Sequence, residues 1–252
     1  MQIVGYDTGA SDDTSSALLL SEDGDVTREP LDPGTELAYT LGERHCAGTF
    51  DSDAHVACQR PDAPYCDAHT STWVCARCTG TCLKDEMDCH EDHAIYLAAF
   101  APTTFKVGVT REWRLSTRLR EQGADRAAHL RTVADGRIAR EIEAELADRF
   151  PDRVRVPRKV ATLHRDVDAA AWADALDEFD PLDTFAFDYG LDLDVRPVAE
   201  TLASGTVVGT KGRVLVLERG GTTYATDVRD LVGHELDAGT TDRSLQASLG
   251  TF

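Results

Sequence analysis

Short apolar runs separated by Gly, Asp and Pro fill the first 45 residues of the chain. They lie at residues 2–6 (QIVGY), 17–20 (ALLL) and 37–41 (LAYTL). Apolar runs of this length, bounded by turn-forming residues, are typical of β-strands. The N-terminal segment is therefore predicted to be rich in β-structure.

The pattern changes after residue 93, where strand-like runs alternate with helical periodicity. Leu115 and Leu119 recur at a spacing of four before Gly123, a residue type that commonly ends a helix. Asp135 is a suitable N-cap for a second helix, whose apolar row is Ile138, Ile142, Leu146 and Phe150. The pattern predicts strand, strand, helix, strand and helix at residues 94–100, 105–110, 112–122, 129–133 and 135–150.

A further helix and a β-rich tail follow. Residues 167–179 have helical periodicity, and strand patterns recur at 206–208, 213–218 and 222–227. The tail strands need a partner sheet, which the N-terminal strands can supply, so we expect both chain ends to form one barrel-like body. The predicted fold class is α+β, with an N-terminal β segment, a cysteine-rich zinc module, a small β-β-α-β-α core and a helix with a C-terminal β-rich segment at residues 1–45, 46–93, 94–160 and 161–252.

All seven cysteines of the chain lie between residues 46 and 89. Two residues separate Cys66 from His69 and Cys75 from Cys78, and three separate Cys78 from Cys82. Zn²⁺ prefers four tetrahedral ligands, and such gaps let one turn present two ligands to the same ion. The predicted zinc ligands are Cys46, Cys58, Cys66, His69, Cys75, Cys78, Cys82 and Cys89.

A disulfide framework is the main alternative to metal. The odd number of cysteines, the length of 252 residues and the lack of a basic-then-apolar N-terminus favour metal. Eight ligands suffice for two closed sites, so we expect two structural zinc ions. The first four ligands could hold one ion and the last four the other, or the pairs could interleave in a cross-brace.

Other histidines lie in or beside the cysteine-rich segment, namely His45, His55, His90 and His93. Imidazole is a common metal ligand, so each could replace one of the predicted ligands. We interpret most of them as solvated loop residues.

The formal net charge is −19, but the 26 basic residues comprise 22 Arg and only 4 Lys. A composition rich in acid and poor in lysine is typical of halophilic proteins, whose acidic surface is independent of their function. The longest apolar run, residues 94–101, is too short to span a bilayer. We therefore expect a cytoplasmic protein with reduced cysteines and no membrane association.

Residues 106–159 form a basic segment within this acidic chain. They hold 14 Lys and Arg against 9 Asp and Glu, a balance of 14 − 9 = +5. Within them Arg111, Arg114 and Arg118 follow one edge of the first predicted helix, and arginine can bind phosphate oxygens in a bidentate manner. The segment is thus a candidate nucleic-acid surface, unless its arginines only pair with glutamates along the helices.

One glutamate of the second predicted helix differs from its neighbours. Glu143 lies beside the apolar row, whereas Glu141 and Glu145 share the charged face. A half-buried carboxylate of this kind is a suitable ligand for a hard cation such as Mg²⁺ or Mn²⁺. With Tyr96 and Lys106 of the hairpin and with Arg118, it supplies the groups that phosphodiester hydrolysis uses; the alternative is that all four are ordinary surface residues.

The order of these elements, with Ala94-Ile95-Tyr96 in the first strand and Lys106-Val107-Gly108 in the second, resembles the GIY-YIG nuclease superfamily. The resemblance implies that Tyr96 helps to activate the attacking water, that Arg118 supports the phosphate and that Glu143 binds a single divalent metal. Ala94 replaces the first glycine of the family pattern, and Lys106 replaces the tyrosine of its second motif. Phage-type relatives of the superfamily also carry lysine at that second position.

A wider resemblance, to the domain-of-unknown-function 2797 family, covers most of the chain. It rests on Cys75, Cys82 and Cys89 and on the stretches HAIYLA (93–98), KVGVTR (106–111), EQGA (121–124) and GTKG (209–212). This resemblance implies an architecture and no particular activity. We therefore expect a zinc-stabilised protein that processes nucleic acid, as a metal-dependent nuclease; the alternative is a non-catalytic zinc protein that binds nucleic acid or another protein.

Overall fold

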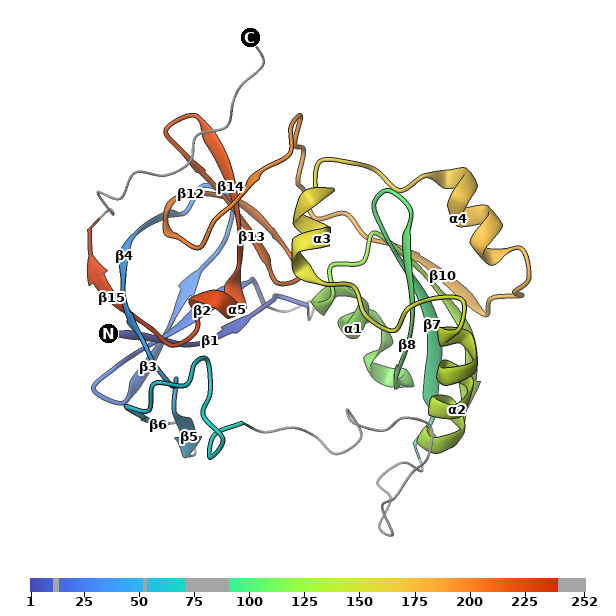
Figure 1. The fold of residues 1–252 in the computed structure, drawn as a ribbon, viewed down its shortest axis with the longest axis horizontal. Coiled ribbons are helices and arrows are strands. Elements are labelled where there is room, and N and C mark those ends of the chain that lie inside the picture. Colours follow the sequence, from blue (N-terminus) through green and yellow to red (C-terminus); the bar gives the residue numbers. More distant parts are fainter. Residues whose placement is uncertain (11–13, 52–53, 71–90, 240–252) are drawn as a thin grey trace. The chain divides into compact units, whose positions relative to one another are not determined.

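The computed structural model describes residues 1–10, 14–51, 54–70 and 91–239. The chain forms two compact units (Figure 1). Unit 1 combines Met1–Ser71 with Tyr189–Phe252, and unit 2 is Thr72–Asp188. Both ends of the chain therefore belong to one unit, and the cysteine-rich segment of residues 46–93 is divided between the two.

A mixed sheet built from both ends of the chain dominates unit 1. In the described residues its strand order is β11 (Val198–Ala199), β14 (Thr222–Asp227), β13 (Val214–Arg219), β12 (Ala203–Lys211), β4 (Glu36–Arg44), β15 (His234–Ala238), β1 (Gln2–Asp7), β2 (Ala17–Glu22) and β3 (Asp25–Pro30). β1 pairs with β15, and β4 pairs with β12 and β15, all antiparallel. These pairings confirm that strands from the two chain ends form one sheet.

The sheet of unit 1 is not a closed barrel. Its order starts at β11 and stops at β3, and no strand pairing in the described part of the chain joins these two edges. β11 has two residues, and β3 carries charged side chains at exposed positions, which are features that prevent edge strands from pairing further. The prediction of a barrel-like body is therefore wrong, because the sheet does not close.

The core of unit 1 lies on this sheet and on the short helix α5 (Val228–Leu231). Apolar side chains from distant parts of the chain meet there, among them Ile3, Leu18, Leu37, Leu215 and Leu231. A small hairpin of β5 (Thr49–Asp51) and β6 (Ala54–Val56) forms a separate sheet and lies between Cys46 and Cys58 in the chain.

Unit 2 has a four-stranded antiparallel sheet with helices on both faces (Figure 1). The strand order in the described residues is β10 (Asp183–Ala186), β9 (Arg126–Val133), β7 (His93–Phe100) and β8 (Thr104–Arg111). The helical elements are the 3₁₀ helix η2 (Glu112–Arg114), α1 (Leu115–Glu121), α2 (Gly136–Ala147), α3 (Val156–Ala161) and α4 (Ala169–Leu176). The predicted order of strand, strand, helix, strand and helix is thus confirmed as β7, β8, α1, β9 and α2.

Strand β7 organises both cores of unit 2, because all eight of its residues are buried. On one face Ile95 and Leu97 pack with residues of α2 and α4, including Ala139 and Trp172. On the other face Tyr96 packs against Leu115 and Leu119 of α1, together with the alternate β7 residues Ala94 and Ala98. A strand covered on both faces has a nearly continuous apolar sequence, which is why this stretch is apolar throughout.

The two longer helices of unit 2 are stabilised at their N-termini by aspartate caps. The Asp135 side chain accepts a hydrogen bond from the amide of Arg137, and Asp168 accepts from Ala170 and Ala171.

The predicted mixed α+β class is confirmed. Sequence patterning missed β3, β10, β15 and α3, which are short or polar elements with few buried apolar positions. None of the helices in the described ranges has the length and apolar character needed to cross a membrane.

We expect Leu97→Ala to destabilise unit 2 by about 2–5 kcal/mol, because truncating a buried leucine removes apolar burial and leaves a cavity. Leu97 is 0% exposed in the centre of the sheet. Leu182→Ala is the matched control, since Leu182 is 64% exposed in the same unit. Urea unfolding followed by fluorescence, to which the buried Trp172 contributes, measures both. Equal unfolding midpoints for the two variants would contradict the described core.

Candidate functional site

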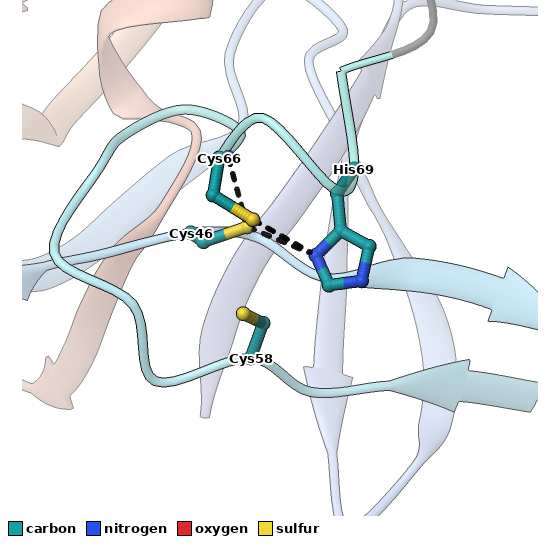
Figure 2. Close-up of side chains that lie close together, drawn as sticks. All are labelled: Cys46, Cys58, Cys66 and His69. Atoms are coloured by element: carbon teal, nitrogen blue, oxygen red, sulfur yellow. Dashed lines mark hydrogen bonds between the residues drawn. The ribbon is translucent and has the colours of Figure 1, made fainter.

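Four of the predicted zinc ligands come together in unit 1. Cys46, Cys58, Cys66 and His69 each offer one ligand atom, and these atoms all lie within 4.8 Å of one another (Figure 2). The His69 Nδ1 atom lies 3.3 Å from the Sγ of Cys46 and 3.5 Å from the Sγ of Cys66. A tetrahedral zinc site with ordinary bond lengths separates its ligand atoms by about 3.5–3.8 Å. The cluster could therefore bind one zinc ion.

A tight turn presents two of these ligands together. The carbonyl of Cys66 accepts hydrogen bonds from the amides of His69 (3.0 Å) and Thr70 (2.8 Å). This turn brings the side chains of Cys66 and His69 to the same point, as their two-residue spacing predicts. Cys46 lies two residues after the end of β4, and its amide donates to the carbonyl of Arg60 at 2.8 Å. The ligands are thus positioned by the end of a core strand and by the loop that returns to it.

Backbone amides point at the Cys46 sulfur. The amides of Cys66 and Gly48 donate to its Sγ at 3.2 and 3.4 Å. Such bonds stabilise a thiolate, which is the form that binds zinc. Gly48 has φ +72°, and a Cβ added there would lie 2.1 Å from the carbonyl oxygen of Val56. Glycine is therefore required where the backbone turns close to the sulfur.

The two buried thiols of the cluster differ in acidity. Burial raises the pKa of the Cys46 thiol above its usual value. Burial acts in the same direction on Cys66, but hydrogen bonds from the Cys46 thiol and from the amides of His69 and Ala68 outweigh it and lower the Cys66 pKa. Cys66 is therefore the thiol that loses its proton more readily when a metal ion binds.

Cys46, Cys58 and Cys66 form no disulfide. This agrees with the metal interpretation for the described cysteines. The grouping matches the sequential arrangement, in which the first four ligands share one ion. The other predicted ligands, Cys75, Cys78, Cys82 and Cys89, lie outside the described residues, as does His90.

Two histidines of unit 1, His45 and His55, bond to the backbone beside the cluster, whereas His93 belongs to unit 2. His45 is 8% exposed, and its Nδ1 lies 2.8 Å from the carbonyl oxygen of Cys58, while Nε2 of the 7% exposed His55 lies 2.6 Å from that of Ala47. His93 is 6% exposed and contacts the carbonyl oxygen of Glu91. Our interpretation of these histidines as solvated is wrong, because their rings fill buried positions and bond to the backbone.

The hairpin of unit 2 holds Tyr96 and Lys106 on one face of the sheet. Tyr96 pairs with Gly108, two positions from Lys106 along β8. The Lys106 ammonium lies 6.0 Å from the centre of the Tyr96 ring. A Cβ at position 108 would lie 2.4 Å from Tyr96 ring and hydroxyl atoms, so only glycine leaves room for the phenol. Tyr96 itself is 1% exposed.

Helix α1 contributes polar groups to the same place. The Gln122 side-chain amide donates to the Tyr96 hydroxyl at 2.7 Å, and the positive charge of Arg118 also acts on that phenol. Arg118 and Arg114 both donate to Glu121. The expected alternative, in which arginines pair with glutamates along a helix, is thus confirmed for Arg118 and Glu121, although Arg118 also faces Tyr96.

Glu143 reaches this region from α2, which packs against β7 and β8 (Figure 1). Its side chain is 13% exposed, whereas that of Glu141 is 47% exposed, so the predicted difference between the two glutamates is confirmed. The charge of Glu143 acts on the pKa of both Tyr96 and Lys106. Arg140 donates to one oxygen of the Glu143 carboxylate.

These surroundings shift the acidity of Tyr96 and Lys106. Burial lowers the pKa of the Lys106 ammonium to about 8; the charge of Arg118 adds to this shift, and that of Glu143 opposes it. Burial raises the pKa of the Tyr96 phenol, against the opposing effects of Gln122 and Arg118. At neutral pH Tyr96 therefore keeps its proton and can donate it in a hydrogen bond, and Lys106 is positively charged but close to its titration.

Three further residues line this site without any sequence motif that indicates it, namely Gln122, Arg140 and Asp152. Gln122 contacts Tyr96, Arg140 contacts Glu143, and the Asp152 carbonyl accepts from Lys106 at 3.0 Å. The spacing of three between Arg140 and Glu143 is the one signal that could have revealed their ion pair. The other two contacts depend on how α1 and the segment after α2 fold back on the hairpin.

Fold and site together define a mixed α+β protein with a Cys₃His cluster suited to zinc and a polar cluster on a helix-covered sheet. A protein-family model described as "Protein of unknown function (DUF2797)" matches residues 34–236. The match covers most of the chain, so the protein belongs to this family. No curated protein and no solved structure matches the chain.

We expect His69→Ala to lower the zinc content by one ion per chain, because three sulfur ligands without the imidazole hold zinc less tightly. Zinc is measured by elemental analysis after dialysis against a moderate chelator. His164→Ala is the control, since His164 lies in unit 2 and takes no part in the cluster. Equal zinc in His69→Ala and in the unsubstituted protein would refute the proposed ligand.

Proposed function

We propose that the protein processes nucleic acid by hydrolysing phosphodiester bonds at the site of Tyr96, Lys106, Arg118 and Glu143. The observation that carries this proposal is the proximity of these groups: the Lys106 ammonium lies 6.0 Å from the centre of the Tyr96 ring, and the charges of Arg118 and Glu143 act on both side chains. The order of these elements and the residues at these positions are similar to those of GIY-YIG nucleases. A phenol, an amine, a guanidinium and a carboxylate in one region suit this chemistry.

In this proposal the cationic side chains bind the substrate phosphate. The Arg118 guanidinium, whose side chain is 45% exposed, can reach a phosphate oxygen from solvent. The Lys106 ammonium supplies a second positive charge. The protonated phenol of Tyr96 accepts a hydrogen bond from Gln122, so its own proton is directed to another acceptor, such as a phosphate oxygen.

Glu143 is the proposed ligand of Mg²⁺ or Mn²⁺. Among the described residues it belongs to no group of three or more potential metal ligands, which suits a cation that keeps most of its waters. Such a cation, when bound, stabilises negative charge on the transferred phosphate. Binding requires that the carboxylate be shared with Arg140 or released by it.

Zinc has a structural role in this proposal. The Cys46, Cys58, Cys66 and His69 cluster uses four protein ligands and leaves no open coordination position for catalysis. We propose that Cys75, Cys78, Cys82 and Cys89 hold a second structural ion.

A non-catalytic nucleic-acid-binding protein is the second candidate. The ion pair of Arg140 with Glu143 and the nearly complete burial of Tyr96 favour it, because both limit access of water and metal to the site. In that case the cationic groups would bind the phosphate backbone without cleaving it.

Glu143→Gln should abolish cleavage that depends on Mg²⁺ or Mn²⁺, because the amide binds a hard cation far more weakly than the carboxylate does. Cleavage is measured on fluorescent single- and double-stranded DNA and RNA. Glu141→Gln is the matched control on the exposed face of α2, where Glu141 pairs with Arg137, and it should cleave normally. Zinc content should be the same in both variants.

Two outcomes separate the candidates. If the unsubstituted protein binds these oligonucleotides and cleaves none of them with either metal, the non-catalytic function replaces the catalytic one. Cleavage that persists in Glu143→Gln would remove this carboxylate from the mechanism.

The affinity for nucleic acid should fall as the pH rises through about 8, because the Lys106 ammonium loses its charge there. The Tyr96 phenol does not titrate in this range, since its pKa is raised. Lys106→Arg should remove the fall, because a guanidinium stays charged. Fluorescence anisotropy at constant ionic strength measures both proteins. The same pH dependence in Lys106→Arg would show that Lys106 is not the responsible group.

A further inference from the structure

Unit 2 has a cavity of about 620 Å³ that the proposed chemistry does not use. It lies between the turn that joins β7 to β8 and the segment of residues 149–158, which connects α2 to α3. Four arginines line it: Arg149, Arg153, Arg155 and Arg158. Its volume is within the usual range for sites that bind small molecules or single monomers of a polymer. We call it the arginine groove.

The charge of the arginine groove differs from that of the chain. Residues 149–158 contain four Arg and one Asp, a balance of 4 − 1 = +3, whereas the whole chain has a net charge of −19. Arg149 pairs with Glu178, and Arg153 lies 3.6 Å from Asp152. Within the described residues Arg155 and Arg158 take part in no ion pair, so their charges are available to an anionic ligand.

Two of the arginines are held in place by neighbours. The Arg158 Nε donates to the Thr104 hydroxyl at 3.1 Å, which ties the first turn of α3 to the opposite wall of the groove. The Arg149 guanidinium lies 4.9 Å from the centre of the Phe150 ring. Side chains restrained in this way lose less conformational entropy when they bind a phosphate.

The remaining walls of the arginine groove are largely apolar. Phe105, Phe150 and Val154 contribute to them. Phosphate groups would not benefit from such walls, but an unpaired base would, since it gains from burial against aromatic and aliphatic side chains. In a duplex the bases are stacked inside and cannot enter a cavity. Charge and lining together fit a single strand better than a duplex.

The arginine groove adjoins the candidate site. The segment that forms one of its walls runs along the edge strand β8, where the amide of Val107 donates to the Pro151 carbonyl at 3.2 Å. The next residue, Asp152, accepts from the Lys106 ammonium at 3.0 Å. The segment that lines the groove is therefore hydrogen-bonded to the Lys106 ammonium through Asp152.

We propose that the arginine groove binds an unpaired nucleotide and the flanking phosphates of a single-stranded nucleic acid. The inference deepens the proposed function, on which it rests for the position of the phosphate that is cleaved. The binding step itself does not depend on cleavage, so the two can fail separately.

The test is the double variant Arg155→Ala/Arg158→Ala in the full-length protein. The probe is a fluorescent 20-residue oligothymidylate, and its affinity is measured by anisotropy over a series of salt concentrations. We expect affinity to fall by roughly tenfold or more and the slope of log affinity against log salt to become shallower by about 1.4, because two phosphate contacts are lost. Arg131→Ala/Arg165→Ala is the matched control, since both arginines are exposed in unit 2 and neither lines the groove.

Comparison with other ligands decides the class of ligand. The same sequence as a duplex should bind several-fold more weakly than the single strand, and thymidine monophosphate should compete only at far higher concentration. Equal affinity in the groove variant and the control, equal affinity for strand and duplex, or no binding of the strand by the unsubstituted protein would each overturn the proposal.

The Glu143→Gln variant separates this inference from the proposed function. If the groove binds the strand in both the unsubstituted protein and Glu143→Gln while neither cleaves it, the arginine groove is supported and hydrolysis is not. If the unsubstituted protein cleaves the strand and the groove variant binds it with full affinity, hydrolysis is supported and the groove proposal fails.

Discussion

The complete burial of strand β7 is the constraint on which unit 2 depends. Successive side chains of a strand point to opposite faces, so a strand that is covered on both faces contributes alternately to two cores. Ile95 and Leu97 therefore face α2 and α4, while Tyr96 faces α1. Burial of the Tyr96 phenol then requires glycine at position 108 and a polar partner, which Gln122 provides. The polar cluster at the sheet edge is thus built around one tyrosine that the core holds in place.

In unit 1, the loop that follows β4 has few apolar residues and cannot form a hydrophobic core of its own. The structure of this loop comes instead from the turns that carry the metal-ligand candidates and from buried histidines that bond to backbone carbonyls. Cys46 belongs to both parts of the unit: it follows a strand of the main sheet, is 0% exposed, and is one of the four ligands of the cluster. Metal binding there would connect the polar loop to the hydrophobic core.

Charge is distributed unevenly in unit 2, and this distribution shapes its proposed function. Several arginines pair with local glutamates, as Arg118 does with Glu121 and Arg140 with Glu143. In the arginine groove, Arg155 and Arg158 take part in no ion pair with the residues that the structure describes, and the neighbouring Lys106 has a pKa that burial lowers. A positively charged groove beside a half-buried polar cluster is an arrangement that suits binding of a phosphate-bearing polymer in an otherwise acidic protein.

The sequence by itself determined the elements with strong apolar periodicity, including the order from β7 to α2, and it identified the candidate zinc ligands without deciding which of them share an ion. These features follow from local spacing, such as the two residues between Cys66 and His69. Only the tertiary structure decided that the sheet stays open, that His45 and His55 are buried, and that Arg140 binds Glu143. The arginine groove also required it, because its walls come from segments separated along the chain whose approach depends on packing rather than on local sequence.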